Sequence, residues 1–326
     1  MKRQALGFGL FSLGLFSIAA LASAAPAGPG DRPAPPIQFL IDKDAFAAPV
    51  AQAETLKSDL LSRFSVRLYG GYCYIGAADV NAGSRGFIDL LETYGGLGFG
   101  TFNGGYNPVH GGFDAGIDLV YQVTPAIGIG LGAGFIRHTQ DSEASLLGAS
   151  YNMITRVSPT VSAVPVRLGA FYTIPISARV DLTAELGGAY YAGLEFDLEE
   201  TQDDLSGHWR ESQFSGGEAG SSKFGVHGSL GLEYKLSAKM GVFIQAAGRY
   251  AKLGNFGTAG VNVNDWVGGG TIDGKLYLRT SIGSLGSNSS FLVYATPPAS
   301  DEDTIYREPK FDLSGFSLQL GIRIRL

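Results

Sequence analysis

The strongest constraint on the fold is a strict alternation of apolar and polar residues along several long stretches of the chain. The alternation is complete over residues 316–326, and a second clear run covers residues 224–236. Successive side chains of a β-strand point to opposite faces, whereas one face of a helix repeats about every 3.6 residues. The period of two therefore predicts strands that have one apolar face and one polar face.

Eight stretches alternate in this way, and each is longer than the roughly nine to eleven residues with which a tilted strand crosses a bilayer. They are residues 64–81, 110–122, 126–139, 160–174, 176–195, 222–236, 238–252 and 311–326. No stretch after the N-terminus approaches the roughly eighteen apolar residues of a membrane-spanning helix. If this chain enters a membrane, we expect it to do so with strands.

The connections between these stretches alternate between short and long. Tight turns are expected at Pro125, Pro175 and Ser237. The other connections are residues 82–109, 140–159, 196–221 and 253–310. Bacterial outer-membrane barrels have such short periplasmic turns and long extracellular loops. The pattern predicts an all-β fold, a closed antiparallel up-and-down transmembrane β-barrel of eight strands.

A barrel of ten strands is the alternative within this class. Residues 275–281 and 290–295 also alternate and could pair inside the last long connection. Both are shorter than the roughly nine to eleven residues of a membrane strand. We therefore interpret them as a hairpin that stands above the membrane.

The N-terminus predicts export. Lys2 and Arg3 precede an apolar stretch, and Ala22, Ser23 and Ala24 supply the small residues that a signal peptidase accepts. We expect residues 1–24 to be a cleaved signal peptide, residues 25–63 a flexible periplasmic leader in which residues 50–64 could form a short helix, and residues 64–326 the barrel. An uncleaved N-terminal anchor is the alternative, which the short, glycine-broken segment disfavours.

The charge argues against a nucleic-acid-binding protein, and the cysteine content argues against a fold stabilised by disulfides. The formal net charge is −6, and it becomes more negative when Lys2 and Arg3 leave with the signal peptide, so nucleic acid is not expected as a partner. Cys73 is the only cysteine. It cannot close an internal disulfide, so an exported chain of this kind must obtain its stability from the fold itself.

Taken together, residues 64–326 resemble the small eight-stranded outer-membrane β-barrel superfamily, the type of the OmpA transmembrane domain, OmpX and OmpW. The resemblance implies localisation in the outer membrane of a Gram-negative bacterium. It also implies outer-membrane lipid and lipopolysaccharide as partners, together with the barrel assembly machinery. In that group the last strand commonly ends in an aromatic residue that this machinery reads, and here Leu326 takes that place.

A secreted barrel of the lipocalin kind is the main structural alternative, and its apolar face would point inward around a ligand. Loop asymmetry favours the membrane version, as do the glycines at every second position from Gly128 to Gly134, which would make room inside a narrow barrel. With the apolar face outward, aromatic residues gather near both strand ends, as in interfacial girdles. They are Phe64, Tyr121, Tyr172 and Tyr234 near the periplasmic end, and Tyr74, Phe135, Tyr190, Phe224, Tyr250 and Phe316 near the other.

The opposite face places five basic and five acidic side chains in the lumen. They are Arg67, Asp114, Asp118, Arg167, Asp181, Glu185, Glu233, Arg249, Arg323 and Arg325. An eight-stranded barrel is about wide enough to be filled by its own side chains, so these charges are expected to pair and seal it. The alternative is a gate whose ion pairs exchange partners and briefly admit water or small solutes.

Enzymatic, metal and cofactor sites find little support, and we expect no catalytic residue, no metal and no cofactor. His227 and Ser229 share a strand face with Glu233 and resemble the His-x-Ser element of outer-membrane lipid A deacylases, but parity directs them into the lumen. The four histidines lack ligand-like spacing. The acidic residues 301–303 are interpreted as a solvated charge run, and the glycines 268–270 do not follow a strand and open a helix, as a phosphate loop would.

The long connections are therefore the expected place of function. Exposed candidates in them are Asn107, Trp209, Trp266 and Phe291. The first hypothesis is a non-enzymatic outer-membrane barrel with a structural or surface-interaction role, whose extracellular ligand or surface partner the sequence does not name. The second is a narrow pore or carrier for small solutes, including apolar ones. The third, which the sequence favours least, is a lipid-modifying enzyme.

Overall fold

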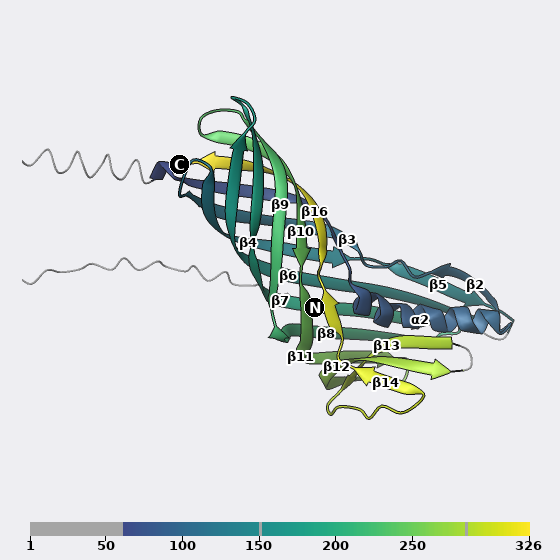
Figure 1. The fold of residues 1–326 in the computed structure, drawn as a ribbon. Coiled ribbons are helices and arrows are strands. Elements are labelled where there is room, and N and C mark those ends of the chain that lie inside the picture. The colour runs from purple at the N-terminus through teal and green to yellow at the C-terminus, as the bar shows by residue number, and fades with distance from the viewer. Residues whose placement is uncertain (1–60, 150–151, 284–285) are drawn as a thin grey trace, which may run out of the picture. The chain divides into compact units, whose positions relative to one another are not determined.

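The computed structural model describes residues 61–149, 152–283 and 286–326 (Figure 1). The predicted signal peptide and nearly all of the predicted leader lie outside these ranges. No helix in the described part of the chain is long and apolar enough to cross a membrane.

A closed ring of antiparallel strands forms one part of the fold. Its members, in ring order, are β1 (Phe64–Ile75), β3 (Gly111–Gln122), β4 (Ile127–Thr139), β6 (Asn152–Pro175), β7 (Val180–Asp203), β9 (Phe224–Lys235), β10 (Met240–Tyr250) and β16 (Gly315–Arg325). Each strand pairs with the next, and β16 pairs with β1 to close the ring. A closed ring has no free strand edge along its wall.

Eight more strands and one helix lie outside the ring, where we expected long loops. They are α2 (Ala78–Gly96), β2 (Thr101–Gly105), β5 (Ser142–Leu147), β8 (Trp209–Ser222), β11 (Lys252–Asp265), β12 (Gly269–Gly283), β13 (Gly286–Tyr294), β14 (Thr304–Arg307) and β15 (Lys310–Asp312). We call these elements, with the parts of β6 and β7 that pair among them, the external layer. The described residues thus contain sixteen strands, and a fold of eight strands is too simple a description of the chain.

The external layer grows out of the ring because two ring strands continue past it. β6 and β7 are 24 residues long each, and they stay paired from Ile154 opposite Asp203 to Pro175 opposite Asp181. Beyond the ring, β5 and β2 add to the free side of β6, and β8, β11, β12 and β13 add to that of β7. The predicted hairpin in the last connection is present as β12 paired with β13, and it lies outside the ring.

Three tight turns close the opposite end of the ring, and all use the same local chemistry. The side-chain oxygens of Thr124, Ser177 and Ser237 accept hydrogen bonds from the backbone N–H groups two and three residues later, at 3.0 to 3.3 Å. Such hydroxyl turns fix the backbone within a few residues. The expected turn at Pro175 is wrong by two residues, because Pro175 still ends β6 and Ser177 makes the turn. We call this end of the ring the turn end.

The ring has its polar face inside and its apolar face outside. In β4 the isoleucines and leucine at 127, 129 and 131 are exposed, while the glycines between them are buried. A Cβ atom on Gly130 would lie 2.3 Å from the ring of Phe171, and one on Gly132 would lie 2.0 Å from Asp118 Oδ1. The prediction that these glycines make room for interior side chains is confirmed.

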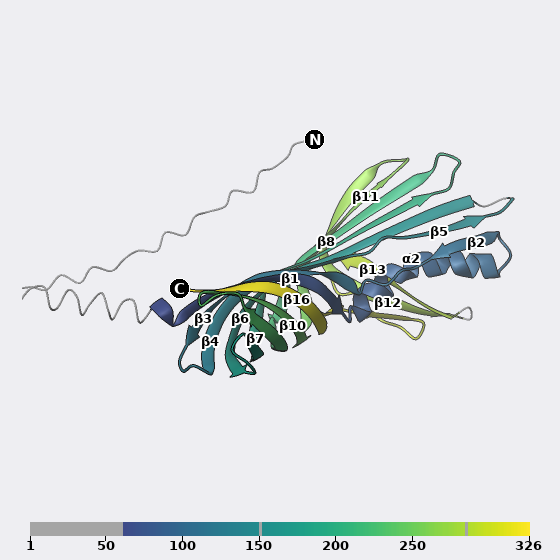
Figure 2. The same cartoon turned by 90° about the horizontal axis from the view of Figure 1, so that it is seen from above.

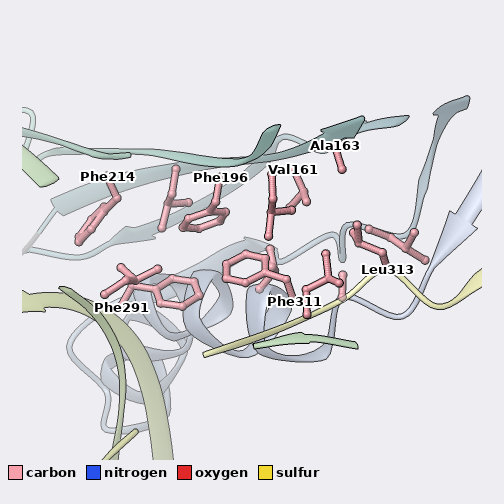
Figure 3. Packing of buried hydrophobic residues seen from close by; sticks show 14 of the residues in the cluster. Val161, Ala163, Phe196, Phe214, Phe291, Phe311 and Leu313 are labelled. Atoms are coloured by element: carbon pink, nitrogen blue, oxygen red, sulfur yellow. The ribbon is translucent and has the colours of Figure 1, made fainter. Parts of the chain in front are cut away.

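The external layer instead has an apolar interior. Helix α2 packs against β2, β5 and β6 and also against β12 and β13 (Figure 2). Val161 of β6 and Phe196 of β7 face Phe291 and Phe311 from the last third of the chain (Figure 3). Phe291 is fully buried, so its assignment as an exposed candidate is wrong: it fills the space that Gly83 leaves open on α2.

The helix α2 was not expected from the sequence, because it contains several glycines that allow close approach to neighbouring elements. Glycine lowers helix propensity, and α2 contains glycines at 83, 86, 95 and 96. A Cβ atom on Gly86 would lie 1.6 Å from the backbone oxygen of Ser289 in β13. The helix is therefore held by tertiary packing that its own sequence does not reveal.

Asp79 fixes the first turn of α2. Its carboxylate accepts hydrogen bonds from both terminal nitrogens of Arg307, at 2.5 and 2.7 Å, and from the backbone N–H of Lys310 at 2.7 Å. Burial by itself would raise the pKa of Asp79. The hydrogen bonds and the charge of Arg307 outweigh it and hold the pKa below its usual value of 3.8.

Replacing Gly86 with Ala is expected to destabilise the external layer by about 1 to 3 kcal/mol, because the added methyl group overlaps the Ser289 carbonyl. Gly96→Ala is the matched control: a Cβ there would meet no atom of a neighbouring element within 4 Å, so the better helix propensity of Ala stabilises by up to about 1 kcal/mol. Rates of limited proteolysis of the folded protein measure both effects. Equal effects of the two variants would contradict the close packing of α2.

Acid is expected to loosen the external layer through Asp79. A carboxyl whose pKa is lowered by folding contributes stability above its unfolded pKa, and the contribution is lost as the pH falls through the lower folded value. Proteolysis should therefore accelerate below about pH 4. Asp79→Asn should be less stable at neutral pH and lose much of this acid dependence. An unchanged pH profile in the variant would show that Asp79 is not the titrating group.

Candidate functional site

The interior of the ring is the candidate site, and strand register sets its charges. Arg67 on β1 stands opposite Asp118 on β3 and opposite Arg323 on β16. Asp181 on β7 stands opposite Glu233 on β9. Like charges face each other at two of these three positions, so the side chains must reach along the barrel axis to find partners of opposite sign.

The middle of the interior holds a four-residue cluster. Arg67 Nη1 lies 3.6 Å from Asp118 Oδ2 and 3.8 Å from Glu185 Oε2, and Arg167 Nη2 lies 2.7 Å from Asp118 Oδ1. The Arg67 guanidinium also lies 4.3 Å from the centre of the Phe243 ring, which adds a cation–π contact. All four charged side chains are largely shielded from water, a setting in which an ion pair is costly to break from one side.

Two smaller groups lie on either side of this cluster. Toward the external layer, Arg249 Nη1 is 3.7 Å from Asp114 Oδ2, and Gln319 donates to the same oxygen at 2.8 Å. Toward the turn end, Arg323 pairs with Glu233 at 3.2 Å, and Arg325 pairs with the second oxygen of that carboxylate.

All ten residues of the expected lumen set point inward, but nine of them form three groups, and Asp181 stands apart from these. Asp181 pairs with none of the expected arginines; its partner is Lys235, at 2.7 Å. The expected charge set omits Lys235 and also His227, whose Nε2 lies 2.9 Å from Glu185 Oε1. Parity places His227 in the lumen, and Lys235 shares the same face of β9 with Glu233, but neither is counted among the pairing charges. The role of the set in gating stays a prediction.

Little free space remains among these side chains. The cavity between the middle cluster and the Asp114 group has a volume of about 40 Å³ and is lined by Asp114, Arg167, Glu185, Arg249 and Gln319, among others. Since a site for one water needs roughly 10 to 15 Å³ of this kind of volume, the cavity has room for a few water molecules. The middle of the interior is thus packed rather than open.

The end of the ring next to the external layer merges into the apolar core. Cys73, Ile136 and Tyr191 of the ring strands belong to the same buried cluster as Leu253 and Leu313 beyond it. Cys73 Sγ lies 3.3 Å from His138 Nε2 within this boundary. Apolar packing thus continues from the ring into the external layer.

The wall has one irregular region, which we call the seam. Pairing between β4 and β6 runs in constant register but skips Gly134 and Phe135, which stand opposite Pro165 and Val164. Proline has no N–H to donate, so this part of the ladder cannot be complete. On the other side of β6, the pairing with β7 shifts by one residue between Ser162 and Val164. The small interior cavity reaches the seam, because Gly134, Phe135 and Pro165 belong to its lining.

His227 and Ser229 do not form a nucleophile–base pair in this arrangement. Ser229 Oγ donates to Glu185 Oε2 at 3.2 Å, and His227 contacts the other oxygen of the same carboxylate. A serine nucleophile needs its proton directed at a base that can accept it during attack. Among the described residues, no three His, Cys, Asp or Glu side chains gather as metal ligands would. The absence of an enzymatic role stays a prediction.

The other expected candidates lie in the external layer. Trp209 and Trp266 are exposed and sit on neighbouring hairpin ends, where the backbone N–H of Trp266 donates to the Trp209 carbonyl at 3.3 Å. The imidazole of His208 lies 4.7 Å from the Trp266 ring. Asn107 is exposed and bonded to Ser142 and Asp141.

No protein-family model and no curated protein matches this chain. Among solved structures it is similar to the outer membrane protein OprG from Pseudomonas aeruginosa, at 12% identity and a TM-score of 0.29, over 80% of this chain and 94% of that chain. A Pseudomonas aeruginosa FadL homologue follows at 6% identity and a TM-score of 0.17, over 81% and 91% of the two chains. At such TM-scores, neither similarity says what this chain does. Membership of the OmpA, OmpX and OmpW group stays a prediction.

The buried cluster provides a stability test. Arg67→Gln removes one partner of two buried carboxylates, which typically costs about 3 to 5 kcal/mol. Arg156→Gln is the matched control: its pair with Glu143 at 2.6 Å is more than half exposed, and such pairs contribute about 0 to 1 kcal/mol. Denaturant unfolding in detergent measures the difference. A loss for Arg67→Gln as small as that for Arg156→Gln would show that the interior is well hydrated.

Proposed function

We propose that this chain is an integral outer-membrane β-barrel protein, without enzymatic activity, that displays its external layer at the cell surface for a structural or surface-interaction role. The observation that carries the proposal is the inverted polarity of the ring. Large apolar side chains such as Leu186 and Leu230 are 73% and 62% exposed on its outside, while carboxylates and arginines are buried inside. Exposed apolar surface of this extent is costly in water and favourable in lipid.

Aromatic contacts at the two ends of the ring support the same proposal. Phe64 and Tyr121 pack together near the turn end, with 5.0 Å between ring centres. Near the other end, Tyr74 stacks on Phe316 and Tyr190 contacts Phe224, both at 5.3 Å. Aromatic residues prefer the interfaces between lipid and water, so these rows fit the two borders of a membrane-embedded band.

The asymmetry of the two ends supports an orientation. The turn end has three short turns, which fit the periplasmic side, and the external layer fits the outer side. Outer-membrane lipid, lipopolysaccharide and the barrel assembly machinery are the partners that this location requires. A packed interior favours a display role over a channel, and the exposed pair Trp209 and Trp266 is the surface where we expect an extracellular partner to bind, because tryptophans are enriched at binding hot spots.

Transport of a small apolar solute through the wall is the second candidate, and the seam favours it. Gly134, Pro165 and the cavity behind them combine an incomplete hydrogen-bond ladder with a small space inside the ring. Opening such a region costs fewer hydrogen bonds than opening a regular pair of strands.

The variant Leu230→Arg distinguishes a ring whose outer face contacts lipid from one whose outer face contacts water. A charge near the middle of a lipid-facing strand costs about 2 to 4 kcal/mol, whereas on a water-facing surface it is close to neutral. Val267→Arg, at an 80% exposed turn of the external layer, is the matched control. Outer-membrane fractions run on gels with and without boiling report the folded barrel. We expect loss of the folded band for Leu230→Arg only; equal behaviour, or a freely soluble wild type, would overturn the proposal.

Planar-bilayer recordings and solute uptake distinguish the two candidates. A display protein with a packed interior should be silent at all voltages and should not speed entry of small apolar solutes. Pro165→Val returns one N–H group to the wall at the seam. Uptake by the wild type that falls in Pro165→Val would replace the display role with the carrier.

A further inference from the structure

A second cavity lies at the turn end of the ring, away from the middle cluster. Its volume is about 200 Å³. Four cationic side chains belong to its lining, namely Arg63, Lys235, Arg323 and Arg325, and among the described lining residues the only carboxylate is that of Asp181. The hydroxyl groups of Ser65 and Thr173 line it as well. From these residues we propose that the turn end holds a binding site for a phosphate-type oxyanion.

Strand register brings the cations together. Arg323 and Arg325 both point inward because they are two residues apart on β16. Gly241 on β10 pairs with Arg323 on one side and with Lys235 of β9 on the other. Gly241 makes room for the Glu233 carboxylate, since a Cβ there would come within 2.6 Å of Glu233 Oε1.

The charges at this end do not balance. Lys235 pairs with Asp181, but Arg323 and Arg325 share the single carboxylate of Glu233. Arg63 forms no ion pair with any other residue in the described ranges. Among the described side chains that line the cavity or pair with its lining, four cations therefore face two carboxylates, so a further anion there would be favourable.

The donor set fits an oxyanion with several oxygens. Guanidinium groups present planar forks of N–H donors that match phosphate oxygens, and an ammonium group adds a point charge. Ser65 Oγ accepts a hydrogen bond from Arg323 Nε at 3.0 Å, so its own proton is available to donate. A cavity of about 200 Å³ is large enough for a phosphate group with a few waters. The phosphate could belong to a free anion or to a phospholipid headgroup, and both have this chemistry.

Titration of inorganic phosphate into the full chain, folded in a neutral detergent, tests the site by isothermal titration calorimetry. We expect saturable binding of one phosphate that equal ionic strengths of chloride do not abolish. Arg325→Gln and Arg63→Gln should each weaken it about tenfold or more, since a charge-assisted hydrogen bond is worth that much. Arg63 lies at the exposed rim outside every ion pair among the described residues, so its variant is expected to fold normally. The gel shift on boiling verifies folding.

Arg179→Gln is the matched control, since Arg179 lies at the same end of the ring, outside the cavity lining, and bonds to Tyr234. It should bind phosphate like the wild type. Absence of saturable binding, or equal weakening in all three variants, would overturn the site. Because the titration is done in detergent, its outcome does not depend on where the barrel resides in the cell.

Native mass spectrometry of the chain from lipid nanodiscs identifies the source of the anion. Discs of phosphatidylcholine alone are compared with discs that also contain phosphatidylglycerol. One phosphatidylglycerol retained by the wild type and lost in Arg325→Gln assigns the site to a lipid headgroup. Phosphate binding without lipid retention assigns it to a free anion, and failure of both overturns the proposal.

Discussion

Closure of the hydrogen-bonded ring is the constraint on which the rest of the structure depends. β16 pairs with both β1 and β10, so the last strand of the chain completes a wall that began with the first. In lipid no water is available to satisfy exposed backbone groups, and a closed wall leaves none along its edges. The seam around Pro165 is the place where this rule is met least completely, which is why the second candidate function is proposed there.

The size of the ring determines which side chains its interior can hold. Its lumen is too narrow to stay empty and too polar to pack like an ordinary core, so arginines and carboxylates pair across it and glycines give them space. Gly132 illustrates this compensation, because any side chain there would displace Asp118 from its place between Arg67 and Arg167. At the turn end the pairing is unequal, and that inequality is the basis of the proposed oxyanion site.

Beyond the ring, the side chains of β6 and β7 have different surroundings. β6 and β7 exchange an inward polar face for one that carries Val157, Phe196 and Leu198, all buried against other parts of the external layer. The layer therefore stabilises itself by ordinary hydrophobic packing around α2, while the ring has paired charges inside and, in the proposed location, lipid outside. One continuous pair of strands thus connects two parts of the chain that are stable for opposite reasons.

Local patterns in the sequence determined the strand faces, the tight turns and the inward charges, because a period of two and a hydroxyl at a turn act over a few residues. They placed Arg67, Asp118 and Glu233 on the inner face without any knowledge of neighbours. Which charge meets which partner, the burial of Phe291, and the existence of α2 were decided only by the tertiary structure. These depend on contacts between segments more than two hundred residues apart, such as Gly86 with Ser289 and Asp79 with Arg307, and no local periodicity encodes such contacts.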